Sequence, residues 1–210
     1  MKDNRMMFFI FMLGTFTVGM AEYVVTGLLT QIAGDMKVSI SSAGLLISVY
    51  AISVALIGPL MRIFTLKVRA QRLLPVLMAI FIISNIIGML APNFPILLLS
   101  RLLSASMHAP FFGVCMSVAA AVAPQGKKPQ AIALVQAGLT IAVMIGVPFG
   151  SFLGGFANWR FVFGVMILLA VITMLGMMKF VPHVALSTEA SVKKELKLFK
   201  NPHILIVMAI

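Results

Sequence analysis

Three ionisable side chains stand inside long apolar segments, where charge is costly. Glu22 lies in the apolar stretch that starts near Met6, and Arg101 and His108 lie in the one that follows Pro95. A carboxylate gains or loses a proton and an imidazole exchanges one near neutral pH, whereas a guanidinium keeps its charge and can only fix a carboxylate or tune its neighbours. These residue types predict a polar path through an apolar structure.

Each of the three also has a structural interpretation, which the sequence leaves open. Glu22 could be the buried partner of Arg101 or of backbone donors, and His108 could be a hydrogen-bonded packing residue. Arg101 and His108 are seven residues apart, a step that keeps two side chains on one face of a helix. Tyr23 follows Glu22 directly. We expect these four side chains to line one cavity that serves protons and a small-molecule substrate.

Patterns that mark soluble enzymes are missing from the sequence. It contains no G-x-S-x-G, C-x-x-C, H-E-x-x-H or Walker A pattern, and its single cysteine, Cys115, cannot form an internal disulfide or, alone, a zinc site. We therefore expect no enzymatic activity, no cofactor and no metal site. Without a nucleotide-binding motif, any process of this chain that needs energy must take it from outside the chain, and an ion gradient is the simplest source.

The composition predicts that lipid surrounds most of the chain. Hydrophobic residues make up 61% of the sequence, charged residues 10%, and the mean hydropathy is +1.13, whereas soluble domains carry about 25% charged residues. So few polar groups cannot cover a water-soluble surface. The net charge of +11 would suggest nucleic acid in a soluble protein, but the charges gather in short loops, so we expect no nucleic-acid partner.

Six apolar segments are long enough to cross a bilayer. A helix needs roughly 20 residues to span a hydrocarbon core of about 30 Å. Breaks rich in turn-forming or charged residues separate the segments. The predicted spans lie near 7–31, 42–64, 73–92, 96–121, 131–155 and 160–181. Together they form a predicted transmembrane bundle over residues 1–182.

Lysine and arginine predict the orientation of the spans. They are plentiful near both ends of the chain and in every second loop, whereas the opposite loops carry only Lys37 and Arg160. Because basic loops stay in the cytoplasm, we expect a multi-pass protein of the plasma (inner) membrane with both chain ends in the cytoplasm. Trp159 fits an anchor at the outer membrane surface.

The residues after the sixth span differ from the rest. Residues 183–202 are polar and basic and predict a cytoplasmic linker. Residues 203–210 are apolar again but too few to span a bilayer, so we expect them to begin a truncated seventh helix. The partners expected for such a chain are membrane lipid and either a missing C-terminal half or a second copy.

A faint repeat relates the first three segments to the last three. Pro59 and Pro148 lie 89 residues apart, each late in an apolar segment, and the same shift sets segments one to three over segments four to six. Because three is an odd number, the two units would have opposite orientations. This is the inverted 3+3 repeat that many transporters contain.

Three segments carry motifs of a known family. Gly19–Leu29 places an acidic residue before an aromatic one and a turn of small residues, and Ser100–Gly113 contains an arginine near its start. The fifth segment has small residues around a Gly-x-Pro, namely Gly146, Pro148, Gly150, Gly154 and Gly155. Over residues 8–210 the chain resembles the major facilitator superfamily, in particular its twelve-span drug:proton antiporter branch, which includes bacterial purine, sugar and chloramphenicol exporters.

The resemblance implies both a fold and a function. The fold would be an all-α membrane protein, a six-transmembrane-helix bundle with an inverted 3+3 repeat, as the N-terminal half of a major facilitator fold. The function would be proton-coupled efflux (antiport) of a small organic solute or drug by alternating access, with Arg101 in the motif implicated in proton coupling. A truncated non-transporting membrane protein and a half-size transporter acting as a homodimer remain alternatives.

One motif departs from the family's pattern. The family's loop between helices 2 and 3 carries Gly-x-Leu-Ala-Asp and then basic residues. This chain has instead Gly58-Pro59-Leu60-Met61-Arg62, followed by Lys67, Arg69 and Arg72. We expect Gly58 and the four basic residues to form the inner-gate loop, with an arginine in place of the family's acidic gating residue.

Overall fold

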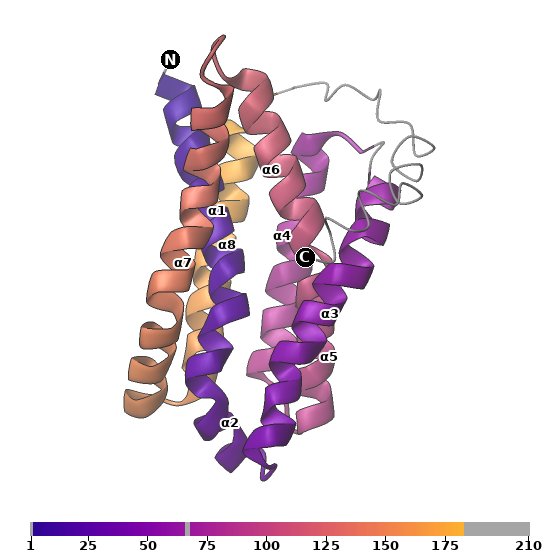
Figure 1. Cartoon of the computed structure of the whole chain (residues 1–210), viewed down its shortest axis with the longest axis vertical. Coiled ribbons are helices and arrows are strands. Elements are labelled where there is room, and N and C mark those ends of the chain that lie inside the picture. Colours follow the sequence, from indigo (N-terminus) through magenta and orange to yellow (C-terminus); the bar gives the residue numbers. More distant parts are fainter. Residues whose placement is uncertain (1, 66–67, 183–210) are drawn as a thin grey trace, which may run out of the picture.

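A computed structural model describes residues 2–65 and 68–182, and every regular element in those ranges is helical (Figure 1). Within the same ranges, six spans are long and apolar enough to cross a membrane. The predicted all-α bundle of six membrane-spanning helices is therefore confirmed. The expected linker at 183–202 and the expected seventh helix at 203–210 lie outside the described residues.

Turn-forming residues set the bounds of the helices. Asn93 and Asn158 each cap the helix that follows, their side-chain oxygens accepting from the backbone N–H of Ile96 and Arg160 at 3.1 and 2.9 Å. The spans in chain order are α1 (Lys2–Tyr23) with the 3-10 helix η1 (Val24–Leu28) and α2 (Leu29–Asp35); α3 (Ile40–Thr65); α4 (Ala70–Met89); α5 (Phe94–Ser106) with α6 (His108–Val122); α7 (Lys128–Phe156); and α8 (Trp159–Phe180). The first and fourth spans are thus each divided.

The pattern of neighbouring spans stays the same when the first three spans are exchanged with the last three. The main neighbours are α1 with α7, α3 with α5, and α4 with α8. Exchanging span one with four, two with five and three with six turns the first pairing into the second and keeps the third. In Figure 1, α1, α7 and α8 accordingly form one side of the bundle, and α3 to α6 the other. This is the arrangement that a 3+3 repeat predicts.

The outward faces of α3 and α7 are strongly apolar. On α3, Leu56 and Phe64 are 65% and 78% exposed, and on α7, Met144 and Phe156 are 72% and 86% exposed. Apolar side chains this open are compatible with lipid or with a further apolar surface, and not with water alone. The six-span chain is a multi-pass membrane protein.

A polar cluster ties three connections together at one end of the bundle. Asp35, the last residue of α2, pairs with the Arg160 guanidinium and accepts a hydrogen bond from the Trp159 indole N–H at 3.0 Å. Arg160 also donates to the Ala91 carbonyl oxygen at 3.1 Å, and its Cζ lies 4.3 Å from the Trp159 ring centroid. The expected role of Trp159 as a membrane-surface anchor is wrong, because this side chain is 2% exposed and bonds to protein.

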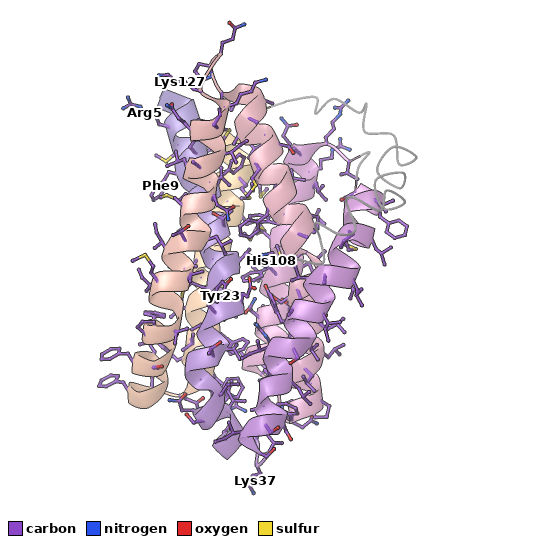
Figure 2. The ribbon with its side chains drawn as sticks, in the orientation of Figure 1. Arg5, Phe9, Tyr23, Lys37, His108 and Lys127 are labelled. Atoms are coloured by element: carbon purple, nitrogen blue, oxygen red, sulfur yellow. The ribbon has the colours of Figure 1, made fainter. Side chains whose placement is uncertain are left out.

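The two ends of the bundle carry different loops. Figure 2 shows Lys37 at one end, and Arg5 and Lys127 together at the other. Loops that follow odd-numbered spans and loops that follow even-numbered spans therefore lie at opposite ends, as six successive spans require. Which end faces the cytoplasm remains a prediction from the basic loops.

Candidate functional site

Two spans are interrupted beside the predicted site residues. The first changes from α-helix to 3-10 helix after Tyr23, next to Glu22, and the fourth breaks at Met107, next to His108. Figure 2 labels Tyr23 and His108 close together near the middle of the bundle. Broken helices at mid-membrane are stable where protein or a lined cavity covers the freed backbone groups, and transporters use them to build binding sites.

At these breaks a chain of polar contacts joins three spans. The Nε2 atom of His108 lies 3.8 Å from Oε2 of Glu22. The other ring nitrogen, Nδ1, lies 3.0 Å from the hydroxyl oxygen of Tyr50 on α3. The His108 ring is also stacked on Phe112, with centroids 4.7 Å apart and planes 9° apart. The imidazole is thus held by its face and by Nδ1, and its Nε2 faces the carboxylate.

Arg101 lies over the face of the Tyr50 ring. Its Cζ is 4.3 Å from the Tyr50 ring centroid, and Nη2 donates to the Ala21 carbonyl oxygen at 2.5 Å. Arg101 is 1% exposed, and its Nε and Nη1 atoms have no hydrogen-bond partner among the described residues. A buried guanidinium with free donors keeps positive charge next to the site. The Glu22 ion-pair contact is with His108, so the alternative of Glu22 as the direct partner of Arg101 is not what the structure shows.

The four predicted side chains differ in access. The side chain of Glu22 is 31% exposed, whereas His108 and Arg101 are buried. Tyr23 is half-buried and lies toward α7, where its Cβ is beside Gly146. Among the described residues no hydrogen bond joins Tyr23 to the other three. The structure therefore brings Glu22, His108 and Arg101 into one cluster and places Tyr23 at its border.

Tyr50 belongs to this cluster, and the sequence reasoning missed it. It is one of two tyrosines in the chain and stands in the middle of the apolar second span. A phenolic hydroxyl at that depth needs a partner when it is buried, and that requirement was the available signal.

The fifth-span glycines form a close contact between α7 and the first span. Small residues, all buried except the half-buried Gly154, recur at every fourth position along α7 and face α1, η1 and α2: Gly138, Ala142, Gly146, Gly150 and Gly154. A Cβ added at Gly150 would lie 2.5 Å from the Val24 carbonyl oxygen, and one at Gly154 would lie 2.7 Å from Gln31 Oε1. Here only glycine allows the helices to pack this closely. Pro148 and Gly155 are exposed and lie off this stripe.

The expected inner-gate residues that the structure describes lie in the second half of α3 and at the start of α4. Gly58 is buried within α3, where an added Cβ would lie 2.7 Å from Ala109 Cβ on α6, and Arg62 belongs to the same helix. Arg69 and Arg72 are exposed at the start of α4. Lys67 and the side chain of Arg62 lie outside the described part of the chain. Gly58 therefore serves helix packing, and the gating role of the basic residues stays a prediction.

Comparison with known proteins decides the family. A sequence profile described as Major Facilitator Superfamily matches residues 11–210. The chain belongs to the major facilitator superfamily. It is 45% identical over 206 residues to YfhI, an MFS-type transporter of Bacillus subtilis (strain 168), covering 98% of this chain and 52% of that protein. It is 40% identical over 194 residues to the inner membrane transport protein YdhP of Escherichia coli (strain K12), covering 92% and 50%.

A third relative and two solved structures agree with this superfamily assignment. The "Probable sugar efflux transporter" of Helicobacter pylori (strain P12) is 34% identical over 214 residues, covering 100% of this chain and 55% of that protein. A crystal structure of a D-xylose-proton symporter matches with a TM-score of 0.72 at 14% identity, covering 96% and 54% of the two chains. An inward-facing bacterial homologue of the lysosomal transporter Spinster matches with 0.70 at 20% identity, covering 94% and 48%. These structures show the major facilitator fold, and the chain spans about half the length of the relatives it matches.

Proposed function

We propose that this six-helix unit is one half of a proton-coupled exporter that exchanges protons for a small organic solute by alternating access. The observation that carries the proposal is the Glu22–His108 contact at the two helix breaks, 3.8 Å apart with Glu22 partly open to the surroundings. A carboxyl group in that position can be ionised and paired, or protonated and neutral. Transport follows if the two protonation states favour different conformations of the whole protein.

The surroundings of Glu22 support a proton-binding role. Arg101, buried over the Tyr50 ring, contributes a fixed positive charge, and His108 offers a second group that exchanges protons. A cationic or strongly polar solute arriving near Glu22 would compete with the proton for the carboxylate. Proton release on solute binding is then the simplest form of coupling.

The direction of transport is proposed from the relatives and from packing. One relative is named as a sugar efflux transporter. Three glycines of the α7 stripe, Gly146, Gly150 and Gly154, also belong to the fifth-span motif in which the chain resembles the antiporter branch. The basic loops favour an inner-membrane location with Arg5 and Lys127 on the cytoplasmic side, at the same end of the bundle in Figure 2. Since the relatives are about twice as long, we propose that a second six-helix unit supplies the other wall of the solute path.

The test measures solute-driven proton movement in everted membrane vesicles from cells that express the complete protein. Inosine, arabinose and chloramphenicol are added separately while a pH-sensitive dye reports the gradient. We expect at least one to release protons, and Glu22→Gln to abolish that release while the protein still inserts in the membrane. Asp35→Asn is the matched control, because it removes a carboxylate from the same span at the Arg160 cluster, and it should keep the release. A Glu22→Gln protein that couples normally would end the proposal.

A further inference from the structure

Tyr50 contacts both the histidine and the arginine of the cluster. Its hydroxyl oxygen is 3.0 Å from His108 Nδ1, and its ring centroid is 4.3 Å from Arg101 Cζ. It is 1% exposed, so the hydroxyl has no access to bulk water. The hydroxyl of this buried phenol interacts with His108 and with the Ser104 side chain, and its ring face interacts with Arg101.

We propose that Tyr50 is the positioning residue of the Glu22–His108 pair, because its hydroxyl holds the ring with Nε2 toward the carboxylate and leaves the ring proton on that nitrogen. This inference rests on the proposed proton-coupling role of Glu22. A neutral imidazole has one N–H donor and one acceptor nitrogen. When the Tyr50 hydroxyl donates to Nδ1, the ring proton is on Nε2, the atom that lies 3.8 Å from Glu22 Oε2. The ionised carboxylate then faces a donor.

The other contacts of His108 leave this choice to the hydroxyl. Stacking on Phe112 fixes the plane of the imidazole, and the Tyr50 ring meets it edge-on at 83° with centroids 5.9 Å apart. The ring can still flip by 180° about its Cβ–Cγ bond, which would put the ring carbons Cδ2 and Cε1 where Nδ1 and Nε2 now lie. The 3.0 Å contact with the Tyr50 hydroxyl is what opposes that turn.

The polar and charged groups around His108 come from three spans. Glu22 faces it from the first span, Tyr50 from α3, and Arg101 from α5 adds positive charge nearby. The neighbouring helices α4 and α7 have only Arg72 and Lys128 as ionisable residues, each in the first turn and exposed. The tautomer of His108 is therefore governed by the Tyr50 hydroxyl on one nitrogen and Glu22 on the other.

Tyr50→Phe separates the two contacts, because phenylalanine keeps a ring over Arg101 and loses only the hydroxyl. Ser53→Ala is the matched control: it removes a hydroxyl three residues further along α3, one that donates to the Val49 carbonyl oxygen of its own helix at 2.6 Å. Both variants are made in the complete protein. Purification in folded form is checked before either measurement.

The first measurement is nitrogen NMR of labelled histidine in lipid nanodiscs without solute, with the His108 signal assigned by its loss in His108→Gln. The wild type and Ser53→Ala should show a protonated Nε2 and an unprotonated, hydrogen-bonded Nδ1. Tyr50→Phe should lose the hydrogen-bonded Nδ1 shift and show a second tautomer. A proton on Nδ1 in the wild type, or an unchanged spectrum in Tyr50→Phe, overturns the inference.

The second measurement is solute-driven proton release with the same three probes. We expect Tyr50→Phe to lower it about ten-fold, as for loss of a buried hydrogen bond, while solute counterflow without a pH gradient stays near the wild-type rate. Normal coupling in Tyr50→Phe beside an active wild type overturns the inference and leaves the role of Glu22 standing. If the wild type itself releases no protons, the proposed function fails, and the NMR result alone decides whether Tyr50 sets the tautomer.

Discussion

Replacing Gly150 by alanine tests whether the first span and α7 are packed as closely as the structure places them. The added Cβ would lie 2.5 Å from the Val24 carbonyl oxygen, about 0.9 Å short of the 3.4 Å at which ordinary contact begins, and 2.9 Å from Val24 Cγ2. The nearest atom belongs to the backbone, so a rotamer change cannot relieve the clash. The helices must move apart, and with them the neighbours of Glu22.

The energy of this change has two parts of opposite sign. Alanine is favoured over glycine inside a helix by about 1 kcal/mol, and overpacking of a close contact costs roughly 1–3 kcal/mol. Gly155→Ala on the same helix and Gly113→Ala within α6 provide the first part alone, since nothing lies within 4 Å of either added Cβ. The difference between Gly150→Ala and these controls therefore isolates the packing cost, about 1–3 kcal/mol of unfolding free energy.

Alkylation of Cys115 on heating provides the assay. This thiol is fully buried in α6, so it reacts only after the bundle opens, and its peptide is read by mass spectrometry. For a chain of this size each kcal/mol moves the midpoint by about 2–4 °C. Gly150→Ala should open at a clearly lower temperature than either control. Equal midpoints for all three variants would refute the close α1–α7 packing.

Two further predictions concern the stability of the bundle. Thr15→Val removes a hydroxyl that donates to the Val135 carbonyl oxygen on α7 at 2.6 Å; the same alkylation assay should show a loss of about 0.6 kcal/mol, at most roughly 1.7, and no loss would mean that this bond adds nothing to the stability of the bundle. Asp35→Asn should cost less than about 1 kcal/mol, because the side chains of Asp35 and Arg160 are 41% and 30% exposed. The difference in unfolding free energy between Asp35→Asn and the wild type should shrink in about 1 M salt. A large loss of stability that does not depend on salt would show that the cluster is more than a screened ion pair.

The fold could be predicted from the sequence because each membrane span is a long, continuous apolar segment. Length and hydropathy alone identify a helix that lipid must surround, and Asn93 and Asn158 mark where two of the helices begin. Even the α7 stripe is visible as glycine spacing, although the sequence could not show that Gly146 and Gly150 face the first span while Pro148 and Gly155 do not. Which residues face which helix depends on the rotation of each span.

The site was predicted only in part, for a related reason. Glu22, Arg101 and His108 stood out because charge in an apolar run is rare. Tyr50 did not, because a tyrosine is amphipathic and its importance comes from the two neighbours that folding brings to it. The break at Met107 had a signal that was overlooked, because Pro110 has no N–H for the carbonyl oxygen of Ser106, where α5 ends. The break after Tyr23 has no proline nearby. Trp159 was misjudged because Asp35, which accepts the hydrogen bond of its buried indole, lies 124 residues away in the chain.

Infrared difference spectroscopy of the complete protein in lipid tests most directly whether Glu22 carries the proton. The spectrum is recorded while the pH is lowered, and again on adding whichever probe drives proton release in vesicles. The account predicts a protonated-carboxyl band that grows on acidification, shrinks on solute addition, and is missing from Glu22→Gln. A band that survives unchanged in Glu22→Gln, or one that solute does not alter, would contradict it.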